Sequence, residues 1–187
     1  MNNYGELKLA WQEWSHRNDL TVSVVSNIQR MTAARLGRDL RTDTNIKTEQ
    51  ITVPADGYTM PFTWKEIHSI RNDAGDHYNF VSSGHFNSKG VHFGYTIEGR
   101  KLYVDKGATV MVTYWHEPDQ LIDDNDSNDV LQAWPNLYLY SGLIEIFRFI
   151  QDSQAMVLYT QQYTAELAKT NEQSQRKRIG NAPVMGY

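Results

Sequence analysis

The chain has 187 residues, of which 40% are hydrophobic and 21% charged, a composition typical of a packed globular protein with one domain. It contains no cysteine, which excludes a disulfide framework and a thiolate metal site and favours assembly in a reducing cytosol. The net charge of −4 argues against a dedicated nucleic-acid-binding protein. No apolar run approaches the roughly 18 residues that a membrane-spanning helix needs, so no membrane partner is expected.

Two amphipathic helices are expected within residues 4–41. Tyr4, Leu7 and Trp11 fall on one face of the first helix, and apolar residues at helical spacing from 24 to 40 predict the second. The arginines of the second helix either form a solvated face that pairs with neighbouring acids, or contact another subunit or passing DNA. These arginines are Arg30, Arg35, Arg38 and Arg41.

From residue 44 to residue 116 the pattern changes to β-structure. Turn residues around Gly99 and Gly107 predict that the last three strands form a meander, and the Gly- and Ser-rich segment 77–93 reads as an exposed loop. The expected result is a small antiparallel sheet inserted between two helical pairs, which makes the fold α+β. The expected strands are 51–53, 64–70, 95–97, 102–104 and 110–115.

An acidic loop at Asp119–Asp129 precedes the C-terminal helices. Its clustered aspartates could suggest a calcium site, but the glycine at position six and the glutamate at position twelve of an EF-hand loop are missing. A solvated loop is therefore favoured over an ion site.

The helix that begins near Pro135 is apolar on two faces. Such a helix must be covered on several sides, either by a large core or by neighbouring subunits, and at this chain length a second copy could supply the cover. The residues proposed for a subunit interface are Leu139, Tyr140, Leu143, Ile146 and Phe147, together with Arg30 and Arg38.

The last long helix, ending near residue 175, is followed by a basic run and then by nine residues without a charged side chain, 179–187. A chain end that is not anchored is normally polar, so this segment indicates an extended arm that docks on a partner; the alternative is a frayed end. The predicted organisation is one domain, 1–178, followed by this arm.

No motif of an enzyme is found. The chain lacks a Gly-rich phosphate loop, a His-Glu-x-x-His sequence and a Gly-x-Ser-x-Gly sequence. Five of the six histidines lie in the β-region, but their spacing matches no metal pattern. We therefore expect no catalytic residues, no metal and no cofactor.

Several segments resemble the head-to-tail adaptor proteins of podoviruses, in the same order along the chain. The helix from Trp134 to Glu145, with its Leu-Tyr-Leu-Tyr run and small Ser-Gly pair, is similar to the penultimate helix of that family. The other similar segments are Tyr4–Leu7, Ala34–Arg41, Val53–Asp56 and Gln161–Leu167.

The resemblance implies a structural protein that forms a ring of about twelve copies beneath the portal of a bacteriophage. The ring would extend the channel for DNA ejection, without reading the DNA sequence, and would offer a platform to tail nozzle or tail tube proteins. Helices 4–41 and 136–175 would form the ring body. The implied protein is part of the virion at the head-tail interface and is assembled in the host cytoplasm. The residues that would bind the portal are Arg176, Lys177, Arg178, Ile179, Pro183, Val184, Met185 and Tyr187.

Three alternatives stay open at this point: a tail-associated cell-wall hydrolase, a head-closure stopper protein, and a cellular α+β oligomer without a phage connection. A catalytic pair would favour the hydrolase. Co-purification with a portal protein would exclude the cellular oligomer.

Overall fold

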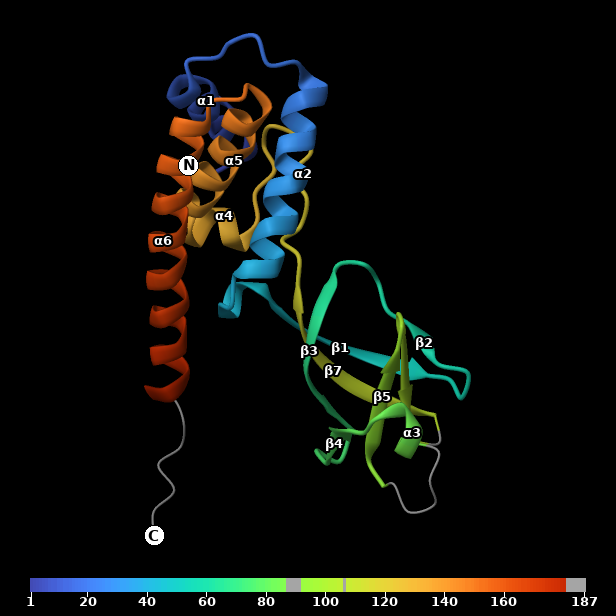
Figure 1. Ribbon diagram of the computed structural model, residues 1–187. Helices are drawn as coiled ribbons and strands as arrows, with labels where there is room; N and C mark the ends of the chain where they lie inside the picture. Colours follow the sequence, from blue (N-terminus) through green and yellow to red (C-terminus); the bar gives the residue numbers. More distant parts are fainter. Residues whose placement is uncertain (87–91, 106, 181–187) are drawn as a thin grey trace. The chain divides into compact units, whose positions relative to one another are not determined.

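The computed structural model describes residues 1–86, 92–105 and 107–180, with side chains through residue 176 (Figure 1). The chain divides into two compact units. The first, here called the helical unit, comprises Met1–Asn45 and Glu117–Tyr187. The second, here called the sheet unit, is the uninterrupted stretch Ile46–His116.

The helical unit contains both expected helix pairs. The first two helices start at capping residues, because the side chain of Asn3 accepts from the Glu6 N–H and that of Thr21 from the Val24 N–H. A short helix, α4, precedes the apolar helix, whose first residue is Pro135. The helices are α1 (Tyr4–Ser15), α2 (Val22–Asp39), the 3₁₀ turn η1 (Asp43–Asn45), α4 (Asp129–Ala133), α5 (Pro135–Phe149) and α6 (Ser153–Gly180).

Helix α5 lies in the middle of this unit, in contact with α1, α2, α4 and α6 (Figure 1). The indole of Trp11 packs directly on Gly142, where an added Cβ would lie only 2.1 Å from the ring. The indole nitrogen donates to the Leu139 carbonyl at 3.2 Å. Glycine inside a helix costs about 1 kcal/mol relative to alanine, so the small residue is explained by the space that the tryptophan needs.

The sheet unit contains a seven-stranded mixed sheet in the order β1-β7-β3-β4-β5-β6-β2. Its longest strand, β7, pairs antiparallel with β1 on one side and with β3 on the other. Val110, Val112 and Tyr114 of β7 are buried and alternate with less buried residues, as expected of a strand with one face on a core. The strands are β1 (Ile46–Val53), β2 (Tyr58–Thr59), β3 (Trp64–Arg71), β4 (His77–Phe80), β5 (Gly94–Glu98), β6 (Lys101–Val104) and β7 (Ala108–His116), with the one-turn helix α3 (Ser83–Phe86) between β4 and β5.

The α+β prediction is confirmed, but the sheet is larger than the small antiparallel one that we expected. It is mixed, because β4 and β5 pair in parallel. The predicted meander is right only for β5 and β6, since β6 pairs with β2 and not with β7. The segment read as an exposed loop contains β4 and α3. These pairings join residues far apart in sequence, which local turn patterns do not reveal.

Helix α6 continues to Gly180, so Ile179 and Gly180, the first residues of the expected arm, are helical. The rest of that arm lies outside the described residues. The single domain with a separate arm therefore remains a prediction. No helix in the described part of the chain is long and apolar enough to cross a membrane.

Candidate functional site

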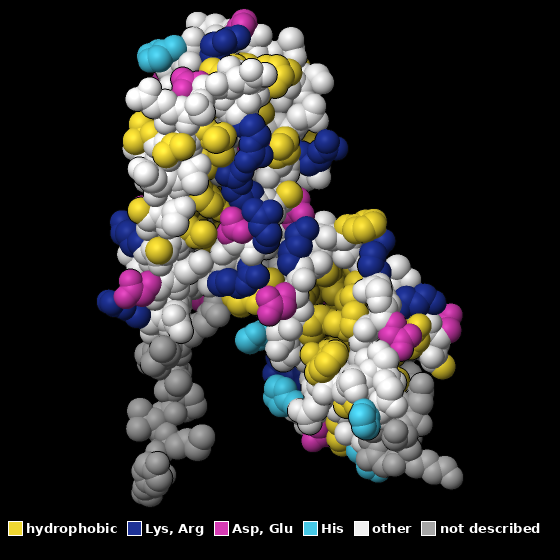
Figure 2. Space-filling model, in the orientation of Figure 1, with side chains coloured by type: hydrophobic (Ala, Val, Ile, Leu, Met, Phe, Trp, Pro, Cys, Tyr) yellow, Lys and Arg dark blue, Asp and Glu magenta, His cyan; other side chains and the backbone are white. Residues whose placement is uncertain are grey.

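Helix α2 presents an exposed ridge to solvent. Two of the residues proposed for the subunit interface, Arg30 and Arg38, lie on this ridge with Asn27 and Ala34, because residues three to four apart share one helical face. Arg30 donates to the Asn27 side chain at 3.3 Å, and Arg38 pairs with Asp39 at 2.8 Å. Figure 2 shows Lys and Arg side chains gathered in a column on the visible face of the helical unit.

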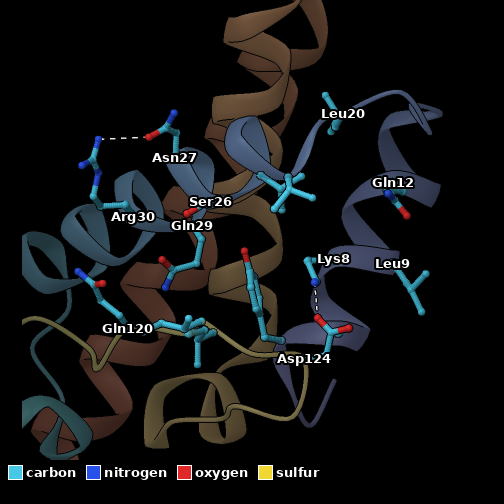
Figure 3. Close-up of a pocket in the computed structure, with 16 residues that line it drawn as sticks. Lys8, Leu9, Gln12, Leu20, Ser26, Asn27, Gln29, Arg30, Gln120 and Asp124 are labelled. Atoms are coloured by element: carbon cyan, nitrogen blue, oxygen red, sulfur yellow. Dashed lines mark hydrogen bonds and ion pairs between the residues drawn. The ribbon is translucent and has the colours of Figure 1, made fainter.

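A hollow of about 610 Å³ lies on one side of the ridge, between α1, the start of α2 and residues 120–124 (Figure 3). Its floor includes Gln29, which is only 3% exposed and whose Nε2 has no hydrogen-bond partner among the described residues. An ion pair between Lys8 and Asp124 closes its edge. We call this hollow, together with the acidic segment Asp119–Asp129, the acidic flank.

The acidic segment is a well-connected turn. The carboxylate of Asp126 accepts the backbone N–H groups of Ile122 at 2.8 Å and Asp123 at 2.9 Å, and these bonds hold its pKa below the usual value. The backbone carbonyls of Asp124 and Asp126 accept the N–H groups of Gly5 and Tyr4. The segment thereby anchors the first turn of α1.

A second hollow, of about 250 Å³, lies on the opposite side of the ridge, between α2 and the end of α5. Its walls are apolar, and Met31 and Phe149 are 44% and 58% exposed. Its edge is charged, because the buried carboxylate of Glu145 binds Arg35 and, at 3.0 Å, Arg148. We call this hollow, together with Arg35, Arg38 and Arg148, the basic flank. It is lined by Val24, Asn27, Ile28, Met31, Glu145, Arg148 and Phe149.

The other residues proposed for the subunit interface lie mainly inside the helical unit. Leu139, Leu143, Ile146 and Phe147 are buried in its core, and Tyr140 packs against that core while partly exposed. The chain itself therefore supplies the cover that α5 needs. Whether these side chains also contact a second copy stays a prediction.

Of the residues proposed to bind the portal, Arg176 is exposed on α6 and pairs with Glu172 at 2.5 Å. Lys177, Arg178 and Ile179 belong to the same helix, but their side chains are not described. Pro183, Val184, Met185 and Tyr187 lie outside the described residues. The structure therefore leaves the portal-binding assignment untested.

A third hollow, of about 430 Å³, lies in the sheet unit between β3, β5 and the residues before β3. Phe62 at its rim is 76% exposed, and the Arg100 guanidinium lies 3.4 Å from the centre of its ring. Figure 2 shows hydrophobic side chains gathered on this unit as well. The sequence did not indicate any of the three hollows, because each is formed by elements distant along the chain.

The described residues show no cluster of three or more His, Cys, Asp or Glu side chains that could hold a metal ion. The described surface offers the charged ridge of α2, hollows with exposed apolar side chains and the long helix α6.

Comparison with known proteins gives one family. The family model described as SU10 adaptor protein matches residues 2–185. No curated protein matches the chain. Since the match covers nearly the whole sequence, the chain belongs to the SU10 adaptor protein family, a family of phage head-to-tail adaptors, and the resemblance noted in its sequence is confirmed.

Proposed function

We propose that this member of the SU10 adaptor family forms a ring of about twelve copies below the portal of a tailed bacteriophage. The ring extends the DNA channel, which the genome crosses without sequence recognition, and it carries tail nozzle or tail tube proteins. The observation that supports this proposal most strongly is the family match over residues 2–185. The protein is accordingly a virion component at the head-tail interface, assembled in the host cytoplasm.

The two units divide this work in our proposal. The helical unit, whose core is filled by α5, forms the body of the ring. The sheet unit faces the tail nozzle or the outside of the ring, where exposed aromatic side chains such as Phe62 and Phe80 offer contact area. The protein works as a structural part and carries out no catalysis, as its membership of an adaptor family suggests.

Residues 179–187 are the portal grip in this proposal. They carry no charged side chain and include Ile179, Val184, Met185 and Tyr187 as apolar anchors. Ordering an arm costs about 1–2 kcal/mol of backbone entropy per residue, so one arm binds weakly. Many arms in a ring act together and raise the avidity. The preceding basic run would meet an acidic portal surface.

The test is binding to portal rings of the same virus, counted by electron microscopy and native mass spectrometry. The complete protein should add a ring of adaptor subunits to the portal. If the complete protein adds no such ring to the portal, the adaptor function itself is contradicted.

Deleting 179–187 tests the grip alone. The truncated protein should keep the circular dichroism of the complete one and fail to join the portal. The matched control is K169A, which removes an exposed charge from the same helix and should bind normally. Full occupancy by the truncated protein would place the grip elsewhere and leave the adaptor function standing.

A further inference from the structure

The two flanks of α2 carry opposite charge. On the acidic flank, the segment from Glu117 to Asp129 contains six acids and no base, and Lys8 and Arg30 are the cations beside its hollow. Asp123 is exposed there, and no ion pair to it is found in the described part of the chain. On the basic flank, Arg35, Arg38 and Arg148 face the single buried carboxylate of Glu145 and the Asp39 side chain.

The flanks also point away from each other. At about 100° per residue, Ser26 on the acidic side and Met31 on the basic side lie roughly 140° apart around α2. Successive copies in a closed ring of about twelve turn by about 30°, so the two contact faces of each copy point about 150° apart. The directions of the two flanks therefore suit head-to-tail contacts that repeat from copy to copy and close into a ring.

Each flank combines its charge with exposed apolar side chains. Leu9, Val22 and Ile122 rim the acidic hollow and are 59%, 87% and 73% exposed. Met31 and Phe149 rim the basic one. Large apolar side chains surrounded by charge are the composition of a protein interface with an apolar centre and a polar rim.

The floor of the acidic hollow also lacks a partner. The Gln29 amide nitrogen is buried there and finds no acceptor in the described residues. A buried donor without an acceptor costs about as much as a lost hydrogen bond, so an acceptor brought in by a docked chain would remove that penalty. Figure 3 shows Gln29 among the residues that line the hollow, with the Lys8–Asp124 pair at its edge.

From these observations we infer that the acidic flank of one copy binds the basic flank of the next copy. The contact is heterologous, because the two surfaces differ, and its repetition generates a ring. This inference rests on the ring-forming function proposed above and specifies the surfaces that form the ring. In this inference, the charge of the acidic segment Asp119–Asp129 selects the neighbouring copy and sets its orientation.

The experiment reverses the charge of each flank separately and counts the copies bound to portal rings. D123K/N125K reverses the charge of the acidic flank at exposed positions and keeps both residues of the Lys8–Asp124 pair. R38E/R148E reverses the basic flank. Because Arg148 contacts buried Glu145, M31E/R38E is prepared as a second basic-flank variant that leaves that contact intact; Met31 is exposed and lines the basic hollow only.

We expect each variant alone to show about a tenfold fall in bound copies at a concentration that half-saturates the original protein. An equimolar mixture of an acidic-flank variant and a basic-flank variant should recover most of the binding, since the two form alternating contacts of opposite charge. K169E, an exposed charge change on α6, should bind as the original does.

The outcomes separate the two proposals. If the original protein forms its ring and both reversed variants do so equally well, the flanks are not the ring contact and the inference is wrong, although the adaptor function stands. Failure of the mixture to recover binding, with all variants folded by circular dichroism, also overturns the inference. If the original protein itself does not join the portal, the adaptor function fails first.

Discussion

The helical unit and the sheet unit are built from the chain in different ways. The helical unit joins two stretches separated by 71 intervening residues, Ile46–His116, and its core connects α1 and α2 with α5 and α6. The sheet unit is one uninterrupted stretch whose first and last strands pair directly, with Ile46 opposite Trp115. The helical unit is therefore held together by side-chain packing between distant stretches, whereas the two ends of the sheet unit are joined by a ladder of backbone hydrogen bonds.

Two kinds of side-chain contact illustrate this difference, buried ones in the helical unit and exposed ones in the sheet unit. In the helical unit, Trp11 fills the space above Gly142, and Glu145 holds two arginines in or near the interior. In the sheet unit, repeated threonine pairs cross from β1 to β7, with hydroxyl oxygens 2.9 Å apart for Thr48 and Thr113. We therefore expect substitutions at these buried contacts of the helical unit to cost more than substitutions at the exposed threonine pairs.

The largest effect is expected from W11A. Removing a buried tryptophan, here 1% exposed, should lower the free energy of unfolding of the helical unit by about 3–5 kcal/mol. Urea unfolding followed by circular dichroism measures the loss. W14A on the same helix is the control, because Trp14 is 46% exposed and should matter less. Equal losses for the two variants would contradict the central role of the Trp11 contact.

The next effect is expected from E145A. This change leaves Arg35, which is mostly buried, without its carboxylate, and breaking such a pair should cost about 3 kcal/mol, the low end of the usual range because Arg148 is more than half exposed. The matched control is E172A, which breaks the exposed pair with Arg176 and should cost about 0.5 kcal/mol or less. A loss from E145A as small as that of the control would refute the importance of the buried cluster.

Alkaline pH should weaken the helical unit through its buried tyrosines. Burial raises the pKa of Tyr138 and of Tyr163 well above the ordinary value near 10. Because each folded pKa is raised, the folded state keeps the proton longer than the unfolded chain does. The stabilisation is thus fully present below pH of about 10 and is lost as the pH rises above it.

The measurement is the urea midpoint between about pH 8 and 11. In Y138F the urea midpoint should fall less steeply as the pH rises. The variant should also lose about 1 kcal/mol of stability at every pH, because the hydrogen bond from Asn128 is removed. Y140F, on the same helix, is the control. An unchanged pH dependence in Y138F would show that this tyrosine does not govern the alkaline loss.

The smallest effect is expected in the sheet unit, from T109A. Thr109 faces Thr52 across β1 and β7, with their hydroxyl oxygens 3.0 Å apart, and such cross-strand pairs contribute about 0.2–1 kcal/mol. A double-mutant cycle with T52A measures the coupling, and the Thr48–Thr113 pair provides an independent repeat. A coupling of several kcal/mol would break the contrast between the two units.

Local chemistry in the sequence was sufficient to predict the four long helices, but not the short helices η1, α3 and α4. Apolar residues at a spacing of three to four predicted α1, α2, α5 and α6, and Pro135 marked the first residue of α5. The apolar character of α5 also showed that it must be covered on several sides, as it is. Residues 134–145, together with similar segments in the same order along the chain, indicated the adaptor family.

The tertiary structure decided what covers α5 and how the strands pair. Sequence patterns could not tell whether α5 is covered by a neighbouring copy or by the chain's own α1, α2 and α6. An apolar stripe indicates only that a helix face is buried, not what buries it. The small residue Gly142 stood in the family motif without a reason until Trp11, 131 residues earlier in the chain, was found above it.

The same reason explains the sheet and the flanks. Periodicity along a strand reveals its faces but not its neighbours, so the place of β7 between β1 and β3 and the parallel pairing of β4 with β5 followed only from contacts across the sheet. The acidic segment was read as a solvated loop, and the arginines of α2 had two readings. That they lie on opposite flanks of α2 could be seen only in the folded structure. The flanks are formed by the elements that pack beside α2, and this packing is set by interactions between residues far apart in the sequence.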